Sequence, residues 1–115
     1  MVTIRFIRDS RERLSAVFAD GHADAAIAGD DLVCGAASTI VQTAELGLLA
    51  YARVIEPARR DAAAGSMRIV VAPEARDRPD VRAILGTAEL AVAQLAQQFP
   101  KNVRYLSETD AAEFG

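Results

Sequence analysis

The sequence of 115 residues is poor in the side chains that carry most metal, redox and disulfide chemistry. It has one cysteine, one histidine and no tryptophan. A single cysteine forms no internal disulfide, no CxxC redox motif and no thiolate zinc cluster. The formal net charge is −3 and the pI is about 5.1, so the chain has no excess of the basic residues that are typical of nucleic-acid-binding domains. We therefore expect no metal, no cofactor and no direct contact with nucleic acid.

The sequence also lacks the patterns that direct a chain to a membrane or through it. No run approaches about 18 consecutive apolar residues, the length that predicts a spanning helix. The first residues, MVTIRFIRDSRER, alternate in polarity and carry charges, and they contain no apolar stretch typical of a signal peptide. We expect one cytoplasmic domain, residues 1–115, with a single modest core and no membrane partner.

The apolar residues that are present follow two periods along the chain. Alternation with a period of two predicts strands, and spacing of three and four residues predicts amphipathic helices. The predicted strands cover residues 2–8, 14–22, 67–73 and 102–108, and the predicted helices residues 31–53 and 81–99. The order β-β-α-β-α-β predicts an α/β fold, a two-layer sandwich of a mixed four-stranded sheet and two helices. Residues 56–66 are small, charged and aperiodic, and we expect them to form a mobile connection.

The only histidine, His22, and the only cysteine, Cys34, stand on either side of a short loop. Asp31 is a good N-cap for the first helix, which would place Cys34 in the first turn beside free backbone N–H groups. The helix dipole there favours the thiolate, the nucleophilic form of cysteine, and the N–H groups could stabilise an oxyanion. His22 could fold back as the base, with Asp31 first a cap and second an orienting group. Ser38, one turn after Cys34, could donate a hydrogen bond near the sulfur or to substrate.

The same residues have purely structural interpretations. A lone cysteine near the start of an apolar helix is most often a packed hydrophobe. A helix serine such as Ser38 commonly bonds back to a carbonyl, and Asp31 needs no role beyond capping. The acidic residues around His22 lack the spacing of calcium or zinc ligands, so we expect a solvated loop and no metal. Residue types and spacing alone leave both a catalytic pair and a packed thiol open.

Gly21-His22-Ala23, then Gly29, then Asp31, Val33, Cys34, Ala36 and Ser38 form one longer pattern. This pattern resembles the signature of the ribosomal-processing cysteine proteases. Their pattern is Gly-His-Ala at a strand end, a short loop, then G-x-D-[hydrophobic]-V-C-[small]-[small]-x-S opening a helix. The total length and the order of predicted elements also agree with that family, so the resemblance extends over essentially the whole chain.

The resemblance implies a cytoplasmic bacterial cysteine endopeptidase, usually a homodimer, that acts in ribosome maturation. It implies Cys34 as the nucleophile and His22 as the general base and later acid. The implied substrate is the precursor of large-subunit ribosomal protein L-twenty-seven, from which the enzyme removes a short N-terminal extension. The loop from Ala23 to Asp30 would cover the cleft and move when the peptide enters, with Gly21 and Gly29 as its hinges.

Two other functions are compatible with the same residues. A non-catalytic ribosome-assembly module would bind the same ribosomal-protein tail and need Cys34 only for packing, so it predicts a buried, slowly reacting thiol. A single-thiol redox sensor predicts a reversible sulfenic acid on Cys34. The sensor is the weaker of the two because the chain has no second cysteine to resolve that acid.

Overall fold

The computed structural model describes residues 1–21, 28–53, 59–61 and 66–110, with the backbone alone for residues 28–31 and 59–61. The predicted order of strands and helices is confirmed, and one further short strand joins the sheet. The elements are β1 (Val2–Arg8), β2 (Leu14–Asp20), α1 (Ala28–Gly47), the π-helical turn η1 (Leu48–Ala52), β3 (Arg59–Asp61), β4 (Ser66–Val70), the short 3-10 helix η2 (Pro73–Ala75), α2 (Pro79–Gln98) and β5 (Val103–Thr109).

The sheet is mixed, with strand order β3-β4-β2-β1-β5. β2 pairs antiparallel with both β1 and β4, β3 pairs antiparallel with β4, and β5 pairs parallel with β1. The additional strand, β3, lies inside the segment that the sequence predicted to be a mobile connection. Its three residues, Arg-Arg-Asp, are too few and too polar to show the alternation that predicts a strand.

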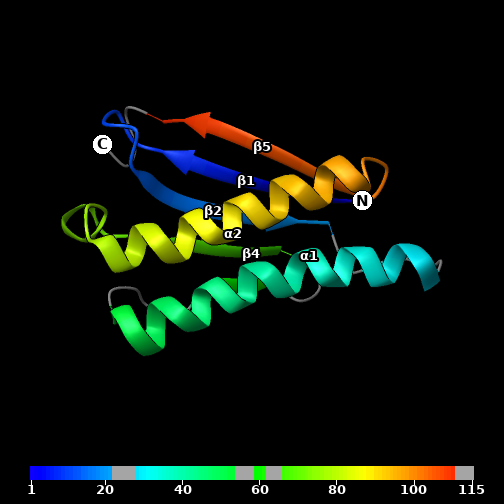
Figure 1. Cartoon of the computed structure of the whole chain (residues 1–115), viewed down its shortest axis with the longest axis horizontal. Helices are drawn as coiled ribbons and strands as arrows, with labels where there is room; N and C mark the ends of the chain where they lie inside the picture. The colour runs from blue at the N-terminus through cyan, green and yellow to red at the C-terminus, as the bar shows by residue number, and fades with distance from the viewer. Residues whose placement is uncertain (22–27, 54–58, 62–65, 111–115) are drawn as a thin grey trace.

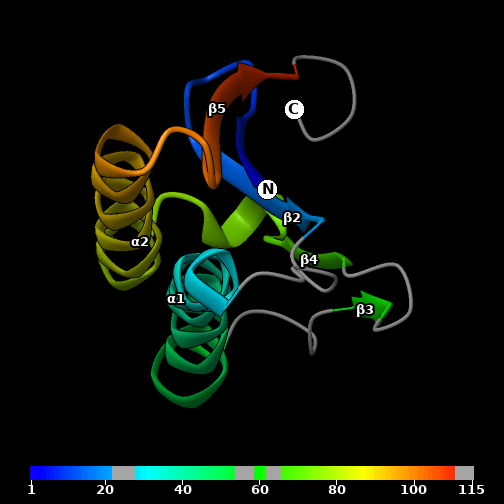
Figure 2. The ribbon, with the colours of Figure 1, turned by 90° about the vertical axis from the view of Figure 1, so that its right-hand side faces the viewer.

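Both helices cover the same face of the sheet and run antiparallel to each other, which gives the predicted two layers (Figures 1 and 2). In β1, Val2, Ile4 and Phe6 are fully buried beneath the helices, while Thr3 and Arg5 between them point to the other face. The helices complete the core with one buried stripe each: Cys34, Ala37, Val41, Ala44 and Leu48 from α1 and η1, and Val81, Leu85, Ala88 and Val92 from α2. The core therefore lies between one sheet face and two helices.

The two helices approach closely near the end of α1. A Cβ added at Gly47 would lie 3.4 Å from the side chain of Ile84 in α2, so the glycine allows tight packing between the helices. The chain then continues through the π-helical turn η1 and leaves it at Arg53, whose φ of 56° is left-handed. The first helical segment thus ends where the sequence predicted it to end.

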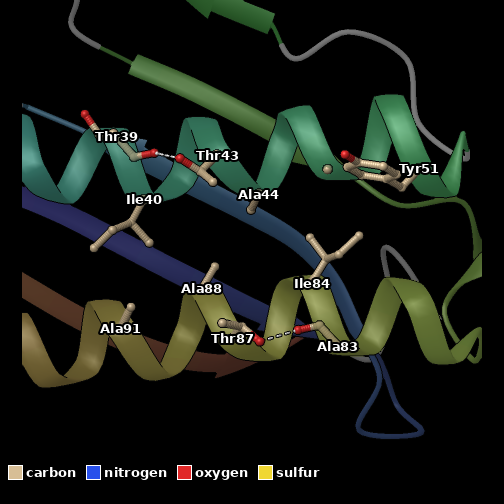
Figure 3. Close-up of a pocket in the computed structure, with 11 residues that line it drawn as sticks. Thr39, Ile40, Thr43, Ala44, Tyr51, Ala83, Ile84, Thr87, Ala88 and Ala91 are labelled. Atoms are coloured by element: carbon tan, nitrogen blue, oxygen red, sulfur yellow. Dashed lines mark hydrogen bonds between the residues drawn. The ribbon is translucent and has the colours of Figure 1, made fainter.

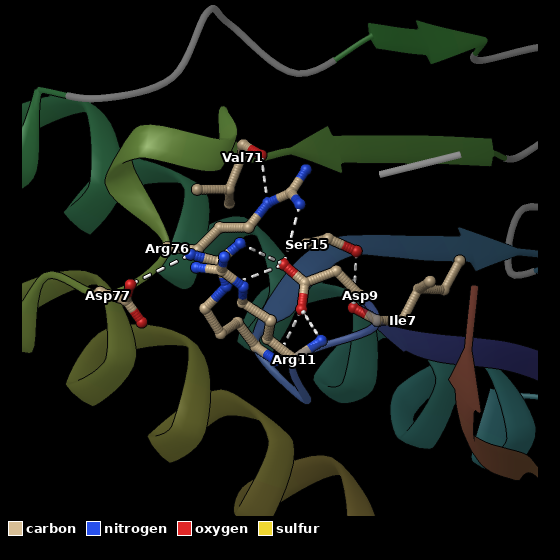
Figure 4. Close-up of polar contacts among 8 residues, drawn as sticks. Ile7, Asp9, Arg11, Ser15, Val71, Arg76 and Asp77 are labelled. Atoms are coloured by element: carbon tan, nitrogen blue, oxygen red, sulfur yellow. Dashed lines mark hydrogen bonds and ion pairs between the residues drawn. The ribbon is translucent and has the colours of Figure 1, made fainter. Parts of the chain in front are cut away.

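A buried ion pair joins the β1–β2 turn to η2 (Figure 4). The Arg76 guanidinium donates to Asp9 Oδ2 at 3.0 Å and to the Val71 carbonyl at 3.0 Å, and both charged residues are buried. Arg13 Nε also donates to Asp9 Oδ2, at 2.9 Å, and the backbone N–H groups of Arg11 and Arg13 donate to Oδ1. Burial alone would raise the pKa of Asp9, but these hydrogen bonds outweigh it and lower the pKa to about 2.

A second polar group ties α2 to the sheet. Glu89 accepts two hydrogen bonds from the Arg8 guanidinium, at 2.9 and 2.7 Å, and one from the Tyr105 hydroxyl at 2.8 Å. Burial opposes the charge on Glu89, yet these donors lower its pKa below the ordinary value. Desolvation and the bond to Glu89 raise the pKa of Tyr105. Glu89, the charged residue that α2 directs toward the sheet, is therefore paired with Arg8 and Tyr105.

Candidate active site

Cys34 lies on the sheet-facing side of α1 and is only 1% exposed. It belongs to the buried stripe of that helix, so its sulfur packs into the core. The sulfur lies 3.6 Å from the carbonyl oxygen of Asn102, to which the thiol donates. Asn102 occupies the turn between α2 and β5, which places the predicted nucleophile at one end of the sheet.

Three strand ends meet at this point. The same Asn102 carbonyl also accepts the backbone N–H of Val2, at the start of β1, at a distance of 2.9 Å. Gly21 follows the last residue of β2, and an added Cβ there would lie 2.9 Å from the carbonyl oxygen of Met1. Gly21 therefore lies beside the Met1–Val2 segment. The Asn102 carbonyl connects that segment to Cys34, because it accepts hydrogen bonds from both the Val2 N–H and the Cys34 thiol.

Gly21 is required by its backbone conformation as well as by this close approach. Its φ of +87° is in the left-handed region, where a side chain is strained. Any Cβ would also press on the Met1 carbonyl at 2.9 Å, below the usual contact distance. Steric constraints therefore explain why the Gly-His-Ala pattern begins with glycine. Its predicted role as a loop hinge stays a prediction.

His22 and residues 23–27 lie outside the described residues, so the pairing of His22 with Cys34 stays a prediction. The described residues do restrict where that part of the chain begins and ends. It begins after Gly21, beside the Cys34 end of the sheet, and it ends at Ala28, the first residue of α1.

The predicted start of the first helix at Asp31 is wrong, because α1 begins three residues earlier, at Ala28. Asp31 therefore lies inside the helix and is not its N-cap. Gly29 lies in the first helical turn, so the predicted loop from Ala23 to Asp30 extends too far along the chain. Its last three residues, from Ala28 to Asp30, belong to α1. Acidic residues are favourable throughout the first turn as well as at the cap, which is why Asp31 resembled a cap.

The earlier helix start also moves Cys34 away from the free N–H groups. Only the first four N–H groups of a helix lack an intrahelical partner, and the dipole effect declines within the first turn. Cys34 lies six residues beyond Ala28, in the second turn. The predicted support of the thiolate by the start of α1 is therefore not present in this structure.

Ser38 is buried, and its hydroxyl donates to the backbone carbonyl of Cys34 at 3.0 Å. This is the bond to the preceding turn that a helix serine commonly makes. The hydroxyl is thus directed to the backbone of Cys34 and not to its sulfur. A contact between Ser38 and substrate stays a prediction.

The described part of the chain contains no group of three or more His, Cys, Asp or Glu side chains arranged to hold a metal ion. Sequence reasoning missed the group that holds the sulfur in place, the Asn102 carbonyl. It had no signal to follow, because every residue carries a backbone carbonyl and only the fold decides which one meets Cys34.

A family model described as cysteine protease Prp matches residues 1–104. The chain belongs to the Prp family of cysteine proteases. The match includes both His22 and Cys34 and ends within β5. A comparison with curated protein sequences finds no match.

Solved structures share the Prp fold over nearly the whole chain. SMU.848 from Streptococcus mutans is 25% identical, with a TM-score of 0.84 and 96% of each chain covered. The essential ribosomal processing protease Prp from S. aureus, in complex with a substrate peptide, is 20% identical, with a TM-score of 0.82. That comparison covers 93% of this chain and 99% of the S. aureus chain. The S. aureus protein with a covalently linked product peptide has the same identity and coverage and a TM-score of 0.79.

In this Prp-family protease, Cys34 is the only residue able to serve as the cysteine nucleophile, since the chain has no other cysteine. Its sulfur is closed off from solvent in the present conformation.

Proposed function

We propose that this protease removes the N-terminal extension of ribosomal protein L-twenty-seven, with Cys34 as nucleophile and His22 as general base. The observation that carries the proposal is the Prp family match, which spans both residues. Cys34 is the only thiol in the chain that could serve as the nucleophile. The S. aureus relative, a ribosomal processing protease, has been crystallised with a substrate peptide and with a covalently linked product peptide. A covalent product supports nucleophilic catalysis in this fold.

The proposed reaction has two steps. The thiolate of Cys34 attacks the carbonyl carbon of the scissile peptide bond, and the C–N bond breaks as the departing amine takes a proton from protonated His22. The product of this step is a thioester on Cys34. Water then gives a proton to His22 and attacks the thioester, which releases the carboxylic acid product and restores the Cys34 thiolate beside protonated His22.

The buried sulfur requires a conformational step before the chemistry. The bond from Cys34 to the Asn102 carbonyl has to break, and substrate has to reach an atom that is now closed off. The energy of substrate binding is the natural source for such an opening. This coupling would restrict cleavage to peptides that bind well enough to open the site.

The remaining parts of the proposal follow from the resemblance. We place the protein in the bacterial cytoplasm, where ribosomes are assembled, and expect it to act as a homodimer without a cofactor. A non-catalytic module that binds the same tail is the competing function, and the buried thiol is what that function expects. The family match favours the protease.

The test is a cleavage assay on the L-twenty-seven precursor from the same host. Wild type, Cys34→Ala and His22→Ala are each incubated with the precursor, and its mass is followed. We expect wild type alone to remove a defined N-terminal peptide. Cleavage by Cys34→Ala at the wild-type rate would show that the nucleophile is wrong, whereas tight binding without cleavage by wild type would support the module.

The role of Ser38 is tested with a matched pair of variants. Ser38→Ala and Thr43→Ala each remove a helix hydroxyl that bonds to the preceding turn of α1. If Ser38 contacts substrate, Ser38→Ala raises KM or lowers kcat well beyond the change in Thr43→Ala. Equal activity of the two variants would leave Ser38 with its structural bond alone.

A further inference from the structure

Two large apolar side chains are exposed at the end of the molecule that holds Cys34. Leu32, in α1, is 76% exposed, and Phe99, the C-cap residue of α2, is 41% exposed. Neither belongs to the core cluster, so burial in the folded chain does not account for their size. Scattered exposed apolar residues are ordinary, whereas exposed apolar residues that stand together mark a binding site. The position of these two relative to each other therefore decides whether they matter.

The packing of α1 against α2 fixes that position. Gly47 of α1 lies opposite Ile84 of α2, because a Cβ on Gly47 would lie 3.4 Å from the Ile84 side chain. The helices run antiparallel (Figure 1), and both rise about 1.5 Å per residue. Leu32 comes fifteen residues before Gly47, and Phe99 comes fifteen residues after Ile84. Leu32 and Phe99 therefore stand at the same level on neighbouring helices, and we call them the exposed pair.

The groove between the two helices agrees with this register (Figure 3). The groove has a volume of about 530 Å³, and Ile40 of α1 and Ala91 of α2 both line it. Each of these two residues is seven positions from the contact of Gly47 with Ile84, in the direction of the exposed pair. The exposed pair lies eight positions farther on, which is about two helical turns.

The surface that leads from the groove to the exposed pair is uncharged. Residues 32–52 include one charged residue, Glu45, which is buried, and residues 83–98 include only Glu89, which is bound to Arg8. The hydroxyls of the threonines that line the groove donate to carbonyls of their own helices at 2.7–2.8 Å. An occupant of this surface therefore meets methyl and methylene groups, and a charged occupant would gain no ion pair there.

The turn that carries Phe99 also holds the sulfur of Cys34. The Phe99 carbonyl accepts the backbone N–H groups of Asn102 and Val103, both at 3.0 Å, and the Asn102 carbonyl accepts the thiol of Cys34. Figure 2 shows this end of the molecule, where the start of α1 and the end of α2 face the viewer. The exposed pair is thus connected to the proposed nucleophile from two sides, through α1 and through the turn after α2.

The direction of the side chains gives the pair its role. Leu32 precedes Cys34 by two residues, so it lies only about 3 Å from Cys34 along the helix axis. Two residues turn the helix by about 200°, so Cys34 faces the sheet while Leu32 faces outward. The exposed pair therefore meets a part of the substrate away from the reacting atoms. Such a contact selects and anchors a peptide and takes no part in the chemistry.

We propose that Leu32 and Phe99 together bind a large apolar side chain of the substrate's N-terminal extension and so determine which peptides are cut. This inference rests on the proposed function, because it places the scissile bond at Cys34. The loss of a few methylene groups from an apolar contact changes recognition by about tenfold or more. A peptide without large apolar residues should therefore bind about tenfold or more weakly than the natural extension.

The test measures binding in the Cys34→Ala background, so that cleavage does not intervene. One fluorescent peptide covers the N-terminal extension of the host's L-twenty-seven precursor, and in a second peptide alanine replaces the large apolar residues. Anisotropy gives the affinity for each. Adding Leu32→Ser or Phe99→Ala should weaken binding of the first peptide by about tenfold and leave that of the second nearly unchanged. Phe99→Leu keeps the apolar bulk and should restore most of the affinity.

The chain offers a matched control for each variant. Leu90→Ser is compared with Leu32→Ser, since Leu90 is 75% exposed in the middle of α2, and Tyr51→Ala is compared with Phe99→Ala, since Tyr51 is 84% exposed in η1. Both control residues lie away from the Cys34 end, so neither variant should change the affinity for the extension. Circular dichroism establishes that each variant is folded, and Leu32→Ser alone decides if Phe99→Ala is not.

The outcomes separate this inference from the proteolytic function. Weaker binding of the natural extension in the exposed-pair variants, with unchanged binding in the controls, supports the inference. That result together with an uncut precursor in wild type would contradict the protease and still support the pair as a peptide-binding contact. Equal affinity in all variants, an equal loss for the alanine peptide, no binding of either peptide, or a change in sedimenting mass that accompanies the loss would overturn it.

Discussion

The sulfur of Cys34 lies 3.6 Å from the carbonyl oxygen of Asn102, across the junction between α1 and the turn that leads into β5. That carbonyl also accepts the N–H of Val2, so one backbone oxygen joins the proposed nucleophile to the starts of β1 and β5. The thiol that we propose as the nucleophile is thus part of the core. Four predictions follow from this geometry and from the polar contacts that support the fold.

Alkylation of Cys34 should be slow in the folded protein. The side chain is 1% exposed, so the thiolate meets a reagent only when the structure opens locally. We expect iodoacetamide to modify the native chain more than about tenfold more slowly than the urea-unfolded chain at the same pH. Mass spectrometry measures the rate without ambiguity, because there is no other cysteine. Equal rates would contradict the burial of Cys34.

Gly21→Ala should destabilise the protein by about 1–3 kcal/mol. The φ of +87° is unfavourable for alanine, and the new Cβ would lie 2.9 Å from the Met1 carbonyl. Gly86→Ala is the control, since an added Cβ in α2 meets nothing within 4 Å. It should be neutral or stabilising by up to about 1 kcal/mol, because alanine is the better helix former. Urea unfolding compares the two, and equal effects would contradict the strained geometry of Gly21.

Arg76→Met should lower the free energy of unfolding by about 3 kcal/mol, since it leaves the buried Asp9 carboxylate short of a partner. Arg78→Met removes an exposed ion pair with Asp80 and should change stability by no more than about 0.5 kcal/mol. Chemical denaturation of both variants measures the difference. A similar small loss in each would indicate that Arg13 alone satisfies Asp9.

The pH dependence of stability should report the ionisation of Asp9. Its pKa is about 2 in the folded protein against 3.8 ordinarily. The carboxylate therefore stabilises the fold fully above pH 3.8, and this contribution is lost as the pH falls through about 2. Unfolding midpoints between these values should fall more steeply in wild type than in Asp9→Asn. Parallel pH profiles would contradict the assignment.

The sequence predicted the strands and helices well because their residues follow clear periods. Val2, Ile4 and Phe6 alternate, and Cys34, Ala37, Val41 and Leu48 recur at helical spacing. Local pattern was insufficient at the start of α1. Asp31 is a residue type that commonly caps a helix, yet α1 begins at Ala28. The sequence did not distinguish the two positions, because acidic residues are favourable both at a cap and in the first turn.

For the site, the sequence by itself predicted His22 and Cys34 as the reactive residues, because each is unique in the chain and both lie in the range that the Prp family model matches. It also determined the uncharged outer sides of both helices. Only the tertiary structure decided that the thiol is buried against the Asn102 carbonyl, that Arg76 meets Asp9, and that a groove opens between α1 and α2. These contacts join residues far apart along the chain, and local sequence patterns carry no information about which distant backbone or side chain will meet them.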